Sequence, residues 1–224
     1  IDAKNGVVLH RYNHVMYDGP VAGSGVDLDN QTRALNVYQI GSDFFLIDAS
    51  KPMFNAGGST LPSDGKGVIY SLDAKNGDKE LFYVKANSAA GFNNPGGVSA
   101  AANGALVFDY YQQKHNRNAI DDKGTTMNLV VNFKTNFNNA FWNGSQMVFG
   151  NGDGNAFRDL AASYDVTAHE MTHGVVEHTA NLVYEFQPGA LNESFADVFG
   201  VLFEFAFKAA TANYLLGEDI TTPN

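Results

Sequence analysis

The feature that most constrains this chain is the segment His169-Glu170-Met171-Thr172-His173. Four helical steps of about 100° bring two such histidines within about 40° of each other, so that both imidazoles can reach one ion. Glu170 lies one step round the helix, where it can contact a water bound to the metal but cannot join the same ligand set. The segment predicts a helix with a metal-binding face. Two surface histidines on an amphipathic helix are the alternative, since the pattern arises by chance in roughly one chain in two hundred.

The composition narrows the kinds of ligand. The 224 residues contain no cysteine, which excludes disulfides and thiolate zinc sites, so any metal must be held by His, Asp or Glu. The formal charge of −10 argues against nucleic acid as a partner. No apolar run approaches the roughly 20 residues that span a bilayer. We therefore expect neither nucleic-acid nor membrane partners.

The pattern of apolar residues changes along the chain. Residues 1 to about 90 contain short apolar stretches separated by Gly, Asn, Asp and Pro, which is typical of strands and turns. A helical period follows from Ser99 to Arg117, then a strand around Met127 to Phe133 and an Asn- and Gly-rich stretch over 136–155. Two helices are predicted near the end, over 164–180 and 190–208, with a break at Gln187-Pro188-Gly189. The class predicted is α+β, with a β-rich early lobe and a helical late one.

A third metal ligand is expected on a neighbouring element, because a catalytic zinc usually takes three protein ligands and keeps one position for water. Glu193 lies 20 residues after His173, near the start of the next predicted helix, where the chain can fold back antiparallel. Asp197 is four residues further on the same face. There it can accept a hydrogen bond from the free ring nitrogen of a ligand histidine and fix its tautomer. A closed structural zinc site is disfavoured, because it would give Glu170 no role.

These segments resemble a known family. The HExxH segment followed by Gly189-Ala190-Leu191-Asn192-Glu193-Ser194-Phe195-Ala196-Asp197 is similar to the thermolysin-like neutral zinc metallopeptidases, the M4 family of gluzincins. The segment Asn138-Asn139-Ala140-Phe141-Trp142-Asn143-Gly144 is similar to the family's edge strand, which grips the substrate backbone. The resemblance extends from about Val21 to the C-terminus. It implies a two-lobe zincin-type fold and a secreted, extracellular endopeptidase made as a zymogen, which acts on proteins or peptides.

The resemblance also implies roles for individual residues. Glu170 would activate zinc-bound water, and Tyr184 with the metal would stabilise the oxyanion. Asn139 and the main chain of Ala140 would orient the peptide as an added strand. A pocket for the residue after the cut would be lined by Phe157, Leu160 and Val166, which implies cleavage on the N-terminal side of bulky hydrophobic residues. Plain core packing is the alternative role for these three side chains.

Calcium is the second metal that the resemblance implies. The matching residues are Asp165, Glu204, Asn213 and Glu218, with a carbonyl near Leu215. Oxygen ligands suit calcium. The family's paired second ion needs an acidic residue where this chain has Leu215, so a single ion is expected here and a pair is the alternative. The loop over 151–155 imitates the start of an EF-hand but lacks its later residues, and a turn is predicted there.

Both ends of the chain depart from the family pattern. Residues 1–18 resemble the last strand of the family's pro-segment, a further expected partner, with maturation cleavage between Asn13 and Ser24; a short strand of the mature fold is the alternative. The β-rich lobe would then span 19–163, and the zinc-binding helices and the start of the helical lobe would span 164–224. The rest of that lobe is expected to be largely missing. A catalytically impaired zinc-binding fragment that needs the missing lobe is therefore the alternative to a complete endopeptidase.

Overall fold

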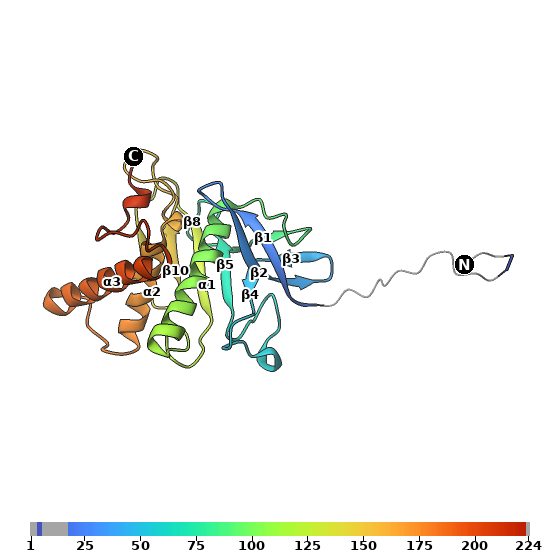
Figure 1. The fold of residues 1–224 in the computed structure, drawn as a ribbon, viewed down its shortest axis with the longest axis horizontal. Helices are drawn as coiled ribbons and strands as arrows, with labels where there is room; N and C mark the ends of the chain where they lie inside the picture. Colours follow the sequence, from blue (N-terminus) through green and yellow to red (C-terminus); the bar gives the residue numbers. More distant parts are fainter. Residues whose placement is uncertain (1–3, 6–17, 223–224) are drawn as a thin grey trace.

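The first of two β-sheets lies at one end of the molecule (Figure 1). The computed structural model describes residues 4–5 and 18–222. The predicted pro-segment over residues 1–18 therefore lies outside the described residues, except for residues 4–5 and 18. The four antiparallel strands of this sheet, in spatial order, are β1 (Gly19–Val26), β2 (Thr32–Ile40), β3 (Asp43–Phe45) and β7 (Lys85–Ala86).

The second sheet carries the strand that borders the candidate site. Its central strands β5, β8 and β10 are parallel, and β9 closes one edge by pairing antiparallel with β10. The strand predicted at Met127 to Phe133 is confirmed as β8. In spatial order the strands are β4 (Ile47–Asp48), β5 (Ile69–Asp73), β8 (Met127–Phe133), β10 (Met147–Gly150) and β9 (Ala140–Trp142), with β6 (Phe82–Tyr83) paired to β5.

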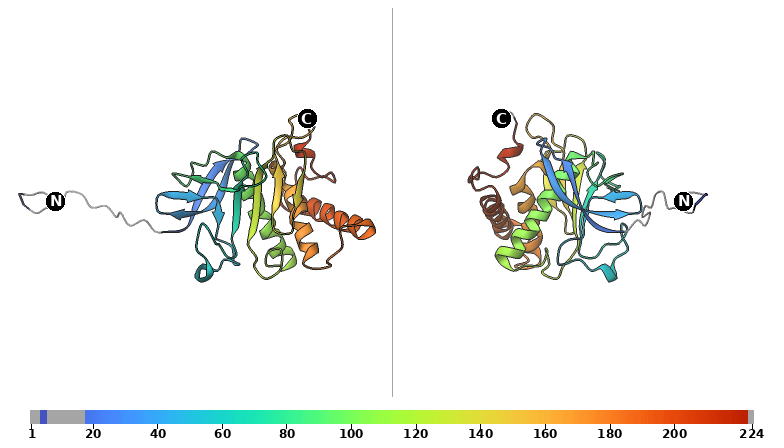
Figure 2. Two further views of the ribbon diagram at one scale, coloured as in Figure 1. Left: turned by 180° about the vertical axis from the view of Figure 1, so that it is seen from behind. Right: turned by 45° about the vertical axis from the view of Figure 1, so that its right-hand side comes forward.

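Helices cover the second sheet and build the opposite end of the molecule. The long helix α1 (Pro95–His115) packs on β5 and β8, and α2 (Tyr164–Glu177) packs along α3 (Phe186–Phe207). Both views in Figure 2 place α2 and α3 together, far from β1 to β3. Short 3₁₀ turns lie at Ala56–Gly58, Leu160–Ala162 and Glu218–Ile220. The predicted α+β class with a β-rich early part is confirmed. Among the described residues, no helix is both long and apolar enough to cross a bilayer.

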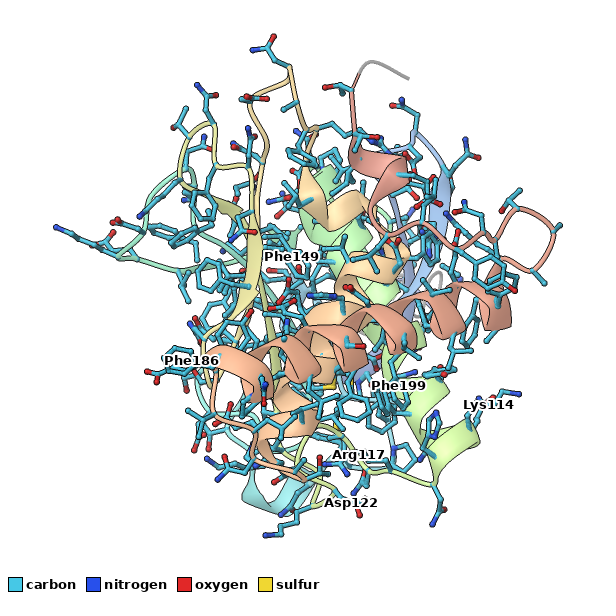
Figure 3. All side chains as sticks on the ribbon, turned by 90° about the vertical axis from the view of Figure 1, so that its left-hand side faces the viewer. Lys114, Arg117, Asp122, Phe149, Phe186 and Phe199 are labelled. Atoms are coloured by element: carbon cyan, nitrogen blue, oxygen red, sulfur yellow. The ribbon has the colours of Figure 1, made fainter. Side chains whose placement is uncertain are left out.

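The prediction for the last long helix was wrong at its start. Gln187-Pro188-Gly189 is not a break but the first turn of α3, which begins at Phe186. Proline is tolerated there because the first N–H groups of a helix have no partner inside it. Phe186 has a φ of 50° and is 89% exposed, so the sharp entry into α3 is made by a bulky residue in left-handed conformation. Figure 3 shows Phe186 at this end of the helix.

The sequence of the helix that carries the two histidines determines where the helix begins and which of its faces is buried. Ser163 caps α2 by accepting a hydrogen bond from the Val166 N–H, and the acidic Asp165 lies in the first turn, where the helix dipole favours negative charge. Ala168 and Met171 are fully buried in the main core. Because residues three and four apart share a face, this burial fixes the rotation of α2 and leaves its neighbouring face for the candidate site.

Asp159, which precedes the turn leading into α2, makes stability depend on pH. Burial raises its pKa to about 6, and Asp73 adds to this rise, against the Ala161 N–H and Arg158, which lower it. An unfolded aspartate titrates at about 3.9. The stability that protonated Asp159 contributes to the folded state is therefore fully present below about pH 4 and is lost as the pH rises through about 6. The Asp159→Asn variant should match wild type at low pH and be more stable at pH 7 by up to about 3 kcal/mol.

Urea unfolding of both proteins from pH 4 to pH 7 measures this effect. The amide oxygen of the variant can still accept the hydrogen bond that Asp159 Oδ1 takes from Ala161 N–H at 3.0 Å, so the comparison isolates the charge. A difference in unfolding free energy that does not change with pH would contradict the prediction.

Candidate active site

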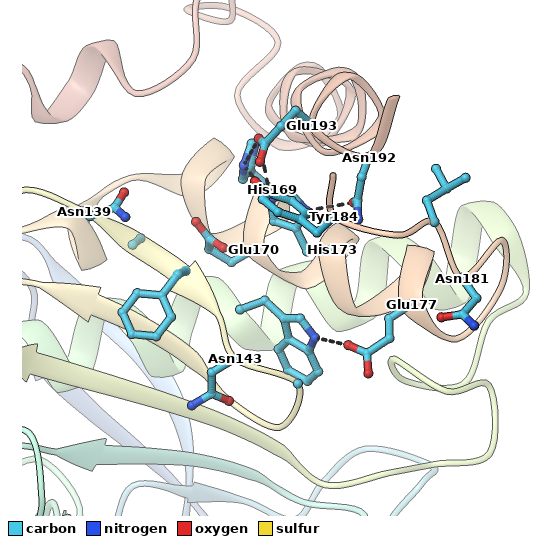
Figure 4. A pocket seen from close by; sticks show the side chains of 15 residues that line it. Asn139, Asn143, His169, Glu170, His173, Glu177, Asn181, Tyr184, Asn192 and Glu193 are labelled. Atoms are coloured by element: carbon cyan, nitrogen blue, oxygen red, sulfur yellow. Dashed lines mark hydrogen bonds and ion pairs between the residues drawn. The ribbon is translucent and has the colours of Figure 1, made fainter. Parts of the chain in front are cut away.

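Three metal-binding side chains meet between α2 and α3. The Nε2 atoms of His169 and His173 lie 3.0 Å apart, and Glu193 Oε2 lies 3.4 Å from the first and 3.7 Å from the second (Figure 4). Both histidines come from adjacent turns of α2, and Glu193 comes from the second turn of α3. In the part of the chain that the structure describes, only this group brings three ligand atoms of His, Asp or Glu within 4.8 Å of one another.

The spacing of these atoms fits a tetrahedral ion. Zinc bonds to imidazole nitrogen and carboxylate oxygen of about 2.0–2.2 Å place neighbouring ligands of a tetrahedron roughly 3.3 Å apart. The observed separations of 3.0, 3.4 and 3.7 Å bracket that value. Two neutral imidazoles and one carboxylate are also a known ligand set of catalytic zinc. The donor set therefore suits zinc, and it leaves one position for water.

Each histidine is oriented by a residue behind it. His169 Nδ1 lies 3.0 Å from Asp197 Oδ1, a carboxylate oxygen that can accept its proton. His173 Nδ1 makes a 2.9 Å hydrogen bond with Asn192 Oδ1. The contact of Asp197 was expected from its position on α3, whereas Asn192 was given no role. An acceptor at Nδ1 places the proton there and leaves Nε2 with a free lone pair for the metal.

The Asn192→Ala variant should weaken zinc binding by about 10- to 100-fold, the usual cost of losing a partner behind a metal-bound histidine. The physical reason is that His173 would no longer be held in one tautomer and one orientation. Competition with a chromophoric chelator measures the affinity. Asn192→Asp keeps an acceptor and should restore most of it, and an unchanged affinity in Asn192→Ala would contradict the role.

The environment of the site raises the pKa of Glu170 and lowers that of His169. Burial raises the pKa of Glu170 to about 8; the charge of Glu193 adds to the rise, and the Trp142 backbone N–H opposes it. Burial and the neighbouring His173 lower the pKa of His169 to about 4, although Asp197 acts in the opposite direction. Neutral imidazole is the form that binds metal, and a carboxylate with a pKa near neutrality can accept a proton effectively at pH 7.

The side chains of His169, His173 and Glu193 line a cleft of about 710 Å³. Asn139 and Ala140 of the β9 side line it, as does Tyr184, whose ring meets that of His173 edge-on with centroids 5.8 Å apart. A second cavity of about 200 Å³ adjoins His169 and Glu170, and its lining includes the three expected apolar side chains, Phe157, Leu160 and Val166. Leu160 and Val166 also belong to the main core, so these two side chains both line the cavity and pack in the core.

Comparison with known proteins supplies the family. The family described as "Thermolysin metallopeptidase, catalytic domain" matches residues 22–177, and "Thermolysin metallopeptidase, alpha-helical domain" matches residues 180–224. The chain belongs to the thermolysin metallopeptidase family. The expected resemblance is thus confirmed, and the predicted lobe boundary between residues 163 and 164 stays a prediction.

Relatives within the thermolysin family are similar over almost the whole chain. Bacillolysin of Bacillus amyloliquefaciens is 40% identical over 99% of this chain and 40% of its own length. Extracellular elastase of Staphylococcus epidermidis is 34% identical over 100% of this chain and 41% of its own length. The solved structure "Precursor of Protealysin, Metalloproteinase from Serratia proteamaculans" matches with a TM-score of 0.61 and 38% identity, covering 68% of this chain and 48% of that chain. This chain therefore spans well under half the length of the first two relatives.

The residues expected to bind calcium lie near one another but form no comparable cluster in the described part of the chain. Asp165 and Glu204 are buried, and Asp165 accepts a 2.7 Å hydrogen bond from Gly217 N–H. Glu204 Oε2 is buried with no hydrogen-bond partner among the described residues, and its pKa is raised by burial first and by Glu218 second. Asn213 donates to Glu218 Oε1 at 2.6 Å. Leu215 is 62% exposed and its N–H donates to Asn213 Oδ1 at 2.6 Å. An orphaned buried carboxylate oxygen beside two further carboxylates fits a hard cation, and calcium stays a prediction.

The loop that imitates an EF-hand is a turn, as predicted. Asp153 Oδ1 accepts hydrogen bonds of 2.8 Å from the N–H groups of both Asn155 and Ala156. The hydrogen bond from Asn138, together with these two backbone bonds, holds the pKa of Asp153 far below its usual range. Asp153 therefore serves the turn by capping its own backbone.

Proposed function

We propose that the protein is a zinc-dependent endopeptidase that hydrolyses peptide bonds on the N-terminal side of bulky hydrophobic residues. The observation that carries the proposal is the meeting of His169, His173 and Glu193 in a cleft that also contains the buried carboxylate of Glu170. A zinc ion held by three protein ligands acts as a Lewis acid and makes water a nucleophile near neutral pH. The names of the relatives, bacillolysin and neutral protease, support the same activity.

The chain's own residues supply the remaining chemistry. Glu170 takes a proton from the attacking water and delivers it to the leaving amine, a role supported by its burial and raised pKa. Tyr184, at the mouth of the cleft and 63% exposed, would donate a hydrogen bond to the oxygen on which charge develops. Asn139 and the backbone of Ala140 would hold an extended peptide against the edge strand β9, because among the described strands β9 pairs only with β10.

The apolar cavity supports a hydrophobic preference. Its volume of about 200 Å³ and its lining by Phe157, Leu160 and Val166 suit a Leu- or Phe-sized side chain. Its lining includes Glu170, which supports a location beside the bond to be cut. Calcium at Asp165, Glu204, Asn213, Leu215 and Glu218 would act by holding the segment after α3 onto the start of α2.

The setting that we propose is extracellular, since a relative carries the name extracellular elastase. The partners would be protein or peptide substrates and the pro-segment, with neither nucleic acid nor membrane. The net charge of −10 supports the exclusion of nucleic acid.

Hydrolysis of quenched fluorescent peptides tests the proposal. Peptides that differ only in having Leu, Phe or Asp after the central bond should be cleaved in the first two cases, with mass spectrometry locating the cut before Leu or Phe. A chelator should abolish the reaction and added zinc should restore it. Stoichiometric zinc without hydrolysis would instead favour the alternative, a catalytically impaired zinc-binding fragment.

A further inference from the structure

Trp142 connects the edge strand of the cleft to the helix that carries the metal group. It is the last residue of β9 and the only tryptophan of the chain. Its indole Nε1 donates a 2.6 Å hydrogen bond to Oε2 of Glu177, the last residue of α2 (Figure 4). The bond is exposed to solvent, but its charged acceptor makes it stronger than a bond between neutral groups, and it joins β9 to α2.

The indole lies against a position of α2 that has no side chain. A Cβ on Gly174 would meet Trp142 Cε2 at 3.2 Å and Cζ2 at 3.3 Å, tighter than an ordinary contact. Gly174 therefore lets the ring lie directly on the helix, one turn before Glu177. The ring's distance from α2 is set by this contact, and its direction along α2 is set by the hydrogen bond to Glu177.

The strand that carries Trp142 also packs on the helix that carries Glu170, and both residues line the cleft. Glu170 and Glu177 are seven residues apart and so lie on one face of α2, two turns from each other. Trp142 thus shares the cleft with Glu170 and is bonded to Glu177 through its side chain. On its other side β9 pairs with β10, where Met147 lies opposite Trp142.

We propose that Glu177 is a positioning residue that acts through Trp142 to fix the edge strand β9 at a set distance from α2. This proposal rests on the proposed peptidase function. Glu177 lies in the lining of the cleft but four residues beyond His173, so it orders the strand without binding the metal. Without this link, β9 would move relative to α2, and the peptide-binding edge would lose its alignment with Glu170.

The test compares Glu177→Ala, Glu177→Gln and Trp142→Phe in the full chain. Loss of one charge-assisted hydrogen bond should lower kcat by about tenfold in Glu177→Ala and in Trp142→Phe. The double variant should lose no more than the more impaired single variant, because both changes break one bond. Glu177→Gln keeps an acceptor and should recover most of kcat. Additive losses in the double variant, or a wild-type kcat in Glu177→Ala, would overturn the proposal.

Two readouts do not need activity. Because Trp142 is the only tryptophan, the emission spectrum of the protein reports the surroundings of this indole. The spectrum should shift in Glu177→Ala but not in the control Glu185→Ala, which changes an exposed acid just before α3. Zinc affinity should stay at the wild-type value in both Glu177→Ala and Glu185→Ala. An unshifted spectrum would refute the positioning role even if no peptide were cleaved, whereas a shifted spectrum with no hydrolysis in wild type would refute only the proposed function.

Discussion

Replacement of Glu170 by Gln is expected to lower kcat for peptide hydrolysis by about 10²- to 10⁴-fold while zinc stays bound. Gln has nearly the same shape and keeps a carbonyl oxygen toward the Trp142 N–H, but it cannot accept the proton of the attacking water. Glu170 is only 4% exposed and does not belong to the group of three ligand atoms, so the metal site should tolerate the change. Initial rates on a Leu-containing peptide and the zinc content of the purified protein measure the two effects.

The matched control is Glu185→Gln, which removes the same charge from an exposed position outside the cleft lining. It should keep the wild-type rate. Retained hydrolysis in Glu170→Gln would show that another group acts as the base. Loss of zinc in that variant would instead show that Glu170 supports the metal site, and its assignment as a base would then fail.

The local part of the site was predictable from the sequence because helical periodicity determines it. His169 and His173 had to share a face once their segment was helical, and the buried Ala168 and Met171 fix which way that face turns. Glu193 was found by its distance from His173 and by the family pattern. The start of α3 was missed because proline and glycine usually end helices, although Pro188 lies where a first turn accepts it.

The tertiary part of the site was not predictable in the same way. Strand β9 was expected only from the resemblance of residues 138–144 to the family's edge strand, and nothing in the Asn- and Gly-rich composition indicated β10, which forms because the neighbouring strand β8 offers its edge. Asn192 and Trp142 have no pattern that reveals their partners, since those partners lie 19 and 35 residues away. The resemblance to the family's edge strand placed Trp142 beside the site but gave no sign of its bond to Glu177.

Removal of Glu193 tests the metal site itself and should lower zinc affinity more than any other substitution proposed above. In the Glu193→Ala variant only two protein ligands remain, so affinity should fall by more than the roughly 100-fold that the loss of an outer partner costs. Hydrolysis should fall with it. Competition with a chromophoric chelator gives the affinity, and Glu185→Ala, with the same loss of charge, should bind zinc as wild type does.

The comparison with Asp197→Asn decides between a ligand and an outer partner. Asp197 faces His169 Nδ1 at 3.0 Å, away from the Nε2 atoms that Glu193 faces at 3.4 and 3.7 Å. Its replacement should therefore cost only about 10- to 100-fold in zinc affinity. If Asp197→Asn lowered the affinity more than Glu193→Ala did, the third ligand would be Asp197, and His169 would have to turn its ring over to present Nδ1. The distances on the two sides of the His169 ring predict the reverse, namely that Glu193→Ala lowers zinc affinity more than Asp197→Asn does.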